Sequence, residues 1–399
     1  MRGMPTPLSA LKQASIDWRL VMMACVLAVI VIVFNVLSGG LFLSPENLYN
    51  VAQQTAVVGI VATVMVLIIV ARHIDLSVGS VMGFVGVLIA TLMYTAGWHW
   101  LQASLVGLLV AIAVSLYQGL LTARLGVPSF VVTLGGLMSF RGAAFLVADG
   151  KTQPVNDEFF QRLGGGFDGS IGANASWALA ILATLALVYK TWSRRRANAQ
   201  YGVANNALWV DALIVFVPAT LVFAFVAAMN SYQIPSKDAP QGVPIPVLIW
   251  AGVALILSFI VHRTRFGRYI FAMGGNPEAA ALVGIPVRRV TLMLFALVGV
   301  LIAVAAIVSI ARLNAGTNSL GTSLELYVIA AAVIGGAALA GGSGSILGSV
   351  LGALIMQCID SGMLLLDVSI GMRYVIIGQV LIAAVVFDVI YRKVTGDTQ

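Results

Sequence analysis

The chain has 399 residues, of which 60% are hydrophobic and only 9% are charged, and its formal net charge is +7. A soluble domain has about 25% charged residues, so this composition excludes an ordinary soluble protein. The apolar runs are continuous rather than alternating, which predicts an all-α, polytopic helical membrane protein and argues against a β-barrel. Most Lys and Arg flank these runs, so their charge orients the chain in the lipid bilayer and does not indicate nucleic-acid binding.

The predicted elements follow one another with short connections. A polar, basic segment at 1–19 precedes the first apolar run, which is too long for the core of a signal peptide and is expected to remain as a span. The expected spans are 20–37, 51–71, 78–97, 101–123, 130–148, 174–192, 208–230, 245–262, 290–311, 326–342, 345–366 and 371–391. We therefore predict about 10–12 transmembrane helices in a single domain over 20–391, with a tail at 392–399. The glycine-rich stretch 326–366 could instead be re-entrant.

A long polar interruption at 262–290 orients these spans. It contains five arginines and one acid: Arg263, Arg265, Arg268, Arg288, Arg289 and Glu278. Basic loops lie preferentially on the cytoplasmic side of a membrane. Threading the spans outward from this loop places most of the 22 Lys and Arg on that side, and it predicts that both termini are cytoplasmic.

Two glycine series have helical spacing and predict close helix packing. They are Gly79, Gly83 and Gly86 in one span, and Gly344, Gly348 and Gly352 in another. Small residues that fall on one stripe of a helix let a neighbouring backbone approach closely within a membrane.

Polar residues within the spans are candidates for a translocation pathway, because ionisable groups are costly in the membrane interior. The candidates are Asp75, Ser77, Arg141, Gln357 and Asp360. Each has a structural alternative. Arg141 and Asp360 could neutralise one another or another charge, and Asp75 could cap the helix that begins after it.

No catalytic site is expected. Gly150, Lys151 and Thr152 resemble the end of a phosphate-binding loop, but Phe145 occupies the position of its first glycine. The histidines are scattered at span ends, and both cysteines lie in apolar runs, so neither a metal site nor a disulfide is predicted. No cofactor is expected. If the protein uses ATP, another chain must hydrolyse it.

The segment Asn276 to Gly284 predicts a short helix inside the polar loop. Asn276 and Pro277 suit its start, Glu278 suits its first turn, and Gly284 with Pro286 ends it. The order of Glu278, Ala279, Ala280 and then Gly284 resembles the coupling loop of ABC importer permeases.

Three stretches together resemble the permease subunits of bacterial sugar ABC importers of the ribose, galactose, arabinose and xylose branch. They are I-D-L-S-V-G-S at 74–80, the loop at 266–290, and V-I-G-G-A-A-L-A-G-G-S-G-S at 333–345. Asp360-Ser361-Gly362-Met363, the following Asp367-Val368 and an additional pair of spans near 208–262 make the xylose-type members most similar. One departure is that Ala337 and Ala338 replace the Thr-Ser pair that often follows the two glycines.

The resemblance implies a type II-like ABC importer permease in a bacterial inner membrane. Two permease chains would form the pathway, and two cytoplasmic ATP-binding subunits would hold the 266–290 loops. A periplasmic sugar-binding protein would dock on the outer loops. Two alternatives remain open at this point, namely a proton-coupled secondary sugar transporter and an ABC permease for a branched-chain amino acid or a nucleoside.

Overall fold

The computed structural model describes residues 18–395 except 167 and 234–238. The predicted N-terminal segment therefore lies almost wholly outside the described residues, as does half of the predicted tail. Ten described helices are long and apolar enough to cross a membrane, and two further apolar helices, Val78–Tyr94 and Leu324–Ile334, are shorter. The prediction of a polytopic helical membrane protein is confirmed.

The chain forms two compact units, which are described separately. The large unit comprises Met22–Gly169 with Ile245 onward, and the small unit comprises Ser170–Pro244 with the residues through Val21. The first helix, α2 (Trp18–Leu37), begins in one and continues into the other. The single-domain expectation stays a prediction.

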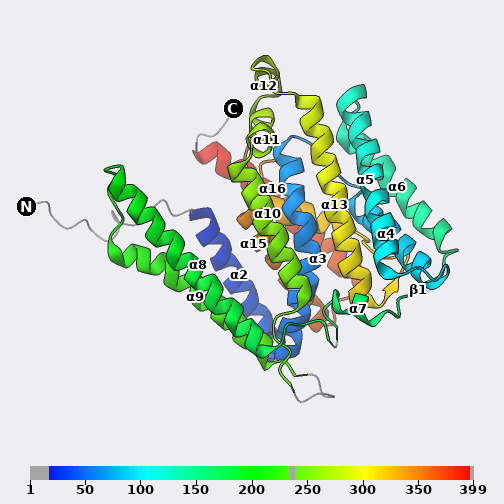
Figure 1. Ribbon diagram of the computed structural model, residues 1–399, viewed down its shortest axis with the longest axis horizontal. Coiled ribbons are helices and arrows are strands. Elements are labelled where there is room, and N and C mark those ends of the chain that lie inside the picture. The colour runs from blue at the N-terminus through cyan, green and yellow to red at the C-terminus, as the bar shows by residue number, and fades with distance from the viewer. Residues whose placement is uncertain (1–17, 167, 234–238, 396–399) are drawn as a thin grey trace, which may run out of the picture. The chain divides into compact units, whose positions relative to one another are not determined.

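The large unit is a bundle of helices (Figure 1). Its other elements are η1 (Leu41–Leu43), α3 (Pro45–Val70), α4 (Val78–Tyr94), α5 (Trp100–Leu125), α6 (Ser129–Val147), β1 (Gln153–Pro154), α7 (Glu158–Arg162), α10 (Ile245–Arg263), α11 (Arg265–Gly275), α12 (Pro277–Leu282), α13 (Val287–Leu313), β2 (Ala315–Gly316), α14 (Leu324–Ile334), α15 (Ile346–Leu365) and α16 (Ile370–Thr395). The two short strands pair antiparallel, with Gln153 opposite Gly316.

Helix α3 is the core of the large unit. It packs against α10, α13, α14 and α15, and it is buried on all sides from Val51 to Val70 apart from Gln54. Its hydroxyls bond within the helix, since the Oγ1 atoms of Thr55 and Thr63 donate to backbone carbonyls three or four residues earlier. These bonds let a polar side chain be buried without a partner on another helix.

The expected span at 326–342 is wrong in its second half. Helix α14 ends at Ile334, and 335–345 is irregular backbone that leads into α15. Gly336, Gly341 and Gly342 adopt positive φ angles of 86°, 88° and 77°, a conformation that a continuous α-helix does not contain. The glycine content of this stretch had left a re-entrant segment open as the alternative, and hydropathy does not locate the end of the helix.

The glycine series lie at close backbone contacts. A Cβ on Gly348 would collide with the carbonyl oxygen of Gly335, and one on Gly352 would collide with that of Ala331, so α15 lies directly on the α14 backbone. Gly344 instead faces the side chains of α3.

Two glycines of the other series face irregular backbone rather than a helix. Gly79 and Gly83 in α4 lie against the carbonyl oxygens of Gly321 and Leu320, in the segment 314–323 that precedes α14. The small side of α4 therefore gives this segment room to run beside it at membrane depth.

The small unit contains α8 (Ala173–Gln200) and α9 (Leu208–Ser231), which pack against each other. Helix α8 continues beyond its predicted span into the basic segment at 194–196. The buried carboxylate of Asp211 accepts hydrogen bonds from Arg194 at 2.8 Å and from Arg195, so one negative charge is shared between two arginines of this segment.

Candidate functional site

The polar loop at 262–290 is mostly helical. Helix α11 begins after Thr264, whose hydroxyl oxygen accepts the N–H of Gly267 at 3.2 Å. Ile270 and Met273 are buried on its inner side, whereas Arg268 is exposed. Sequence reasoning missed this helix because its arginines mark a loop in a hydropathy profile.

The short helix predicted after Asn276 is confirmed as α12 (Figure 1). The side chain of Asn276 accepts the N–H of Ala279 at 2.9 Å, Pro277 occupies the first turn, and Gly284 turns the chain with a φ of +85°. These features are those of a capped and sharply terminated helix. Glu278 is exposed, and Ala280 is buried at 4% exposure.

Large apolar side chains are exposed where α12 ends. Leu282 is 89% exposed and Val283 is 78% exposed, although both lie in a polar loop beyond the ends of the long helices. Exposed apolar side chains beside a rigid helix are typical of a protein-docking surface.

Arg72 fixes the start of this short helix to the core. It lies just after α3, where its Nε donates to the carbonyl of Gly274 at 2.7 Å and its Nη2 donates to that of Gly275 at 2.6 Å. The backbone approach is close, because a Cβ on Gly274 would collide with the carbonyl oxygen of Val70. Nothing in the local sequence of Arg72 indicates these partners, which lie about two hundred residues later.

A second polar group lies at the start of α4. The Oδ1 atom of Asp75 accepts the N–H of Ser77 at 2.8 Å and lies 2.7 Å from its hydroxyl, which also lies 3.0 Å from Gln118 Oε1. Asp75, Ser77 and Gln118 are all buried. The helix cap is Ser77 rather than Asp75, and Asp75 orders the turn that leads into it.

Arg141 joins this region to the irregular segment before α14. Its Nη1 donates to the carbonyl oxygens of Asn318 at 3.1 Å and Leu320 at 2.8 Å. Glu325, in the first turn of α14, lies within electrostatic reach of both Arg141 and Asp75. Sequence reasoning missed Glu325 because it placed the following span from 326 and left this residue outside.

Four buried polar atoms in this group have no hydrogen-bond partner among the described residues. They are Asp75 Oδ2, Gln118 Nε2, Asn318 Oδ1 and Glu325 Oε2. Unpaired polar atoms are costly inside a protein, and they are most often explained by water or by a solute. The group therefore offers both donors and acceptors to a polar molecule within the membrane-spanning part of the chain.

The remaining pathway candidates have other partners. Asp360 pairs with Arg373 at 2.6 Å and accepts the hydroxyl of Tyr327 at 2.9 Å. Gln357 donates to Gln54 at 2.7 Å. The structural alternative for Asp360 thus holds with Arg373 and not with Arg141, and among the described residues no hydrogen bond joins Asp360 or Gln357 to the Asp75 group.

Comparison with known proteins identifies relatives over almost the whole chain. The family model of the branched-chain amino acid transport system permease component matches residues 47–385. The xylose transport system permease protein XylH of Haemophilus influenzae is 36% identical over 96% of this chain and 99% of its own length. The XylH protein of Escherichia coli is 36% identical over 92% of this chain and 91% of its own length, and the ribose import permease protein RbsC of E. coli is 30% identical over 91% of each. No solved structure matches the chain significantly.

Proposed function

The chain belongs to the family of branched-chain amino acid transport system permease components, and from this premise we propose that it is the membrane subunit of an ATP-driven importer for a monosaccharide, xylose. The observation that carries the proposal is the 36% identity to a xylose permease over 96% of the chain. The multi-pass helical architecture is that expected of an inner-membrane permease.

The chain supplies a pathway, and separate subunits supply the energy. An ATP-binding subunit pair contacts α12 on the cytoplasmic face, with Leu282 and Val283 entering an apolar groove of that partner. Arg72 carries the resulting displacement to α3, because it ties the start of α12 to the end of the central helix. ATP then favours one permease conformation over another through this contact.

The other partners and the orientation follow from the same assignment. A second copy of the chain completes the pathway, and a periplasmic sugar-binding protein delivers the sugar at the opposite face. Both termini lie in the cytoplasm, because the loop that holds α12 and the basic end of α8 face that side. The permease itself hydrolyses no ATP.

The polar group around Asp75 is the first candidate for sugar contacts within the pathway. Its unpaired donors and acceptors match the hydroxyl groups of a sugar, which both donate and accept hydrogen bonds. Ser77 and Arg141 position this group, whereas Gln357 and Asp360 stabilise the contacts of α15.

Uptake by the purified importer in liposomes tests the function. We expect labelled xylose to accumulate only with ATP at the cytoplasmic face and the sugar-binding protein at the other. A protonophore should have no effect. Uptake that needs a proton gradient instead of ATP would identify a secondary transporter. ATP-dependent uptake of a branched-chain amino acid or a nucleoside, and not of xylose, would assign a different substrate.

Two substitutions test the contact with the ATP-binding subunits. Glu278→Arg reverses the charge in the first turn of α12, and Gly284→Asp strains a residue whose φ is +85°. Both should abolish uptake while xylose still binds the periplasmic partner. Transport retained in both variants would refute the role of α12.

A further inference from the structure

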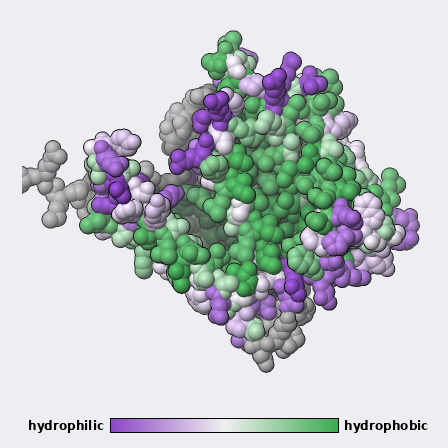
Figure 2. Space-filling view, in the orientation of Figure 1, coloured by the Kyte–Doolittle hydropathy of each residue, from purple (hydrophilic) through white to green (hydrophobic). Residues whose placement is uncertain are grey.

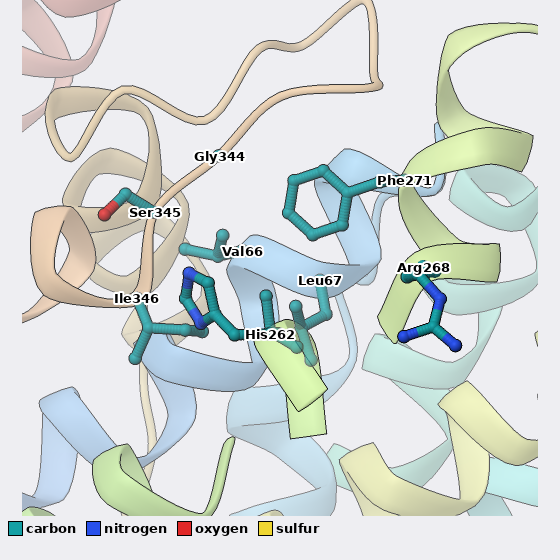
Figure 3. A pocket seen from close by; sticks show the side chains of 9 residues that line it. Val66, Leu67, His262, Arg268, Phe271, Gly344, Ser345 and Ile346 are labelled. Atoms are coloured by element: carbon teal, nitrogen blue, oxygen red, sulfur yellow. The ribbon is translucent and has the colours of Figure 1, made fainter. Parts of the chain in front are cut away.

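A cavity of about 460 Å³ opens where the helices α3, α10 and α11 meet the start of α15 (Figure 3). Its apolar lining includes Val66, Leu67, Phe271 and Ile346. Two residues with polar side chains, His262 and Arg268, also belong to this lining. The cavity is therefore amphipathic, with apolar walls and the charged side chain of Arg268 among its lining residues.

The cavity lies at the level where the apolar spans end. His262 is in the last turn of α10 and Arg268 is in α11, whereas Val66 and Leu67 belong to the last turn of α3. In a bilayer this depth is the boundary between acyl chains and headgroups, where long basic side chains extend toward the polar layer.

An exposed apolar stripe on α10 leads to the cavity. Leu255 is 72% exposed and Phe259 is 63% exposed. Leu255 lies four residues before Phe259, and Phe259 lies three residues before His262, so all three side chains lie on one face of the helix. This stripe gives a hydrocarbon chain a continuous apolar path that ends at the cavity.

The charged residues around the cavity are basic. Neither Arg265 nor Arg268 has an ion pair in the part of the chain that the structure describes, and the single acid of the loop, Glu278, lies on α12. Figure 2 shows hydrophilic surface above the broad hydrophobic surface of the large unit. The guanidinium groups of Arg265 and Arg268 are therefore free to pair with an anionic ligand.

We propose that this cavity binds an anionic phospholipid, with the phosphate beside Arg268 and His262 and an acyl chain along Leu255 and Phe259. Basic pockets between transmembrane helices at the cytoplasmic face are suited to acidic headgroups. The lipid contacts α11, which continues directly into α12, so it steadies the segment that the proposed function assigns to the ATP-binding subunits.

Lipid retained by the full-length permease tests the site without any transport measurement. The protein is purified from membranes that contain phosphatidylglycerol and phosphatidylethanolamine, and bound lipid is counted by native mass spectrometry. Arg268→Gln should lower retained phosphatidylglycerol about five-fold, since one basic side chain near a membrane surface contributes roughly that factor.

Arg289→Gln is the matched control, because Arg289 is exposed in the same polar region, lies outside the cavity and loses the same charge. It should retain the lipid. Equal retention of phosphatidylglycerol by the two variants overturns the proposal. The proposal is also overturned if the unaltered protein retains phosphatidylethanolamine as well as it retains phosphatidylglycerol. Displacement by millimolar inorganic phosphate also overturns it, because the site would then take soluble anions. A failure of xylose import leaves this measurement unaffected, so the two proposals are tested separately.

Discussion

Replacing Arg72 with Met should release the start of α12 from the core. The substitution keeps a long aliphatic side chain but removes both donors to the carbonyl oxygens of Gly274 and Gly275. Arg72 has a φ of +63°, and Met has the same penalty there as Arg, so the change isolates the guanidinium.

The size of the effect follows from the two bonds. A hydrogen bond to a charged group contributes about 1.5–3 kcal/mol, and solvent competition lowers this because the side chain is exposed. We take about 1 kcal/mol for each bond, or about 2 kcal/mol in total. Since 1.4 kcal/mol is tenfold in an equilibrium, local opening of this segment should become about 30-fold more frequent.

Amide hydrogen exchange of the full-length permease measures this opening directly. Peptides that cover 268–285 should exchange about 30-fold faster in the variant, while peptides from the middle of α3 should not change. Arg124→Met is the control, because Arg124 is an exposed arginine at the end of α5 that makes no hydrogen bond or ion pair with the described residues. Unchanged protection in the Arg72 variant, or equal acceleration in both, would refute the clamp.

Three further substitutions test the packing and the polar group. Gly348→Val should destabilise the fold by about 3 kcal/mol or more, because the new side chain meets a carbonyl oxygen at the end of α14. The Gly348 variant should lose its monodisperse peak in size-exclusion chromatography. The Gly378→Val variant should remain monodisperse, because a Cβ on Gly378 would meet no atom within 4 Å. Asp360→Asn should lower stability by about 2 kcal/mol, because it leaves the partly buried Arg373 without its counter-charge. In thermal denaturation, adding Arg373→Met should cost less than the sum of the single changes, and strict additivity would contradict the pair. Arg141→Met should reduce xylose uptake at least tenfold in liposomes without changing basal ATP hydrolysis, and normal uptake would exclude its role in holding the segment before α14.

Hydropathy and basic loops could predict most of the fold, because the bilayer demands long apolar helices. The expected span at 326–342 was wrong in its second half, because glycines with positive φ angles end the helix at a point that hydropathy averaged over a whole span does not locate. The cap of α12 could also be read locally, since Asn276, Pro277 and Gly284 act within a few residues of their positions.

The candidate site was less predictable because its contacts are distant in sequence. Arg72 reaches residues about two hundred positions later, and Arg141 reaches carbonyls of a segment that hydropathy assigned to an outer loop. Glu325 is the second residue of α14, and the expected span began one residue after it. Backbone carbonyls are present at every residue, so no sequence pattern marks those that an arginine will find.

The burial of α3 has a consequence for biosynthesis. This helix emerges from the ribosome more than two hundred residues before α13, α14 and α15, which later enclose it. Until then, its side chains must face lipid or the insertion machinery, including Gln53 and Gln54, whose final partners are Gly165 and Gln357. Its apolar length is sufficient for independent insertion, but its enclosed position is reached only when the last third of the chain has been made.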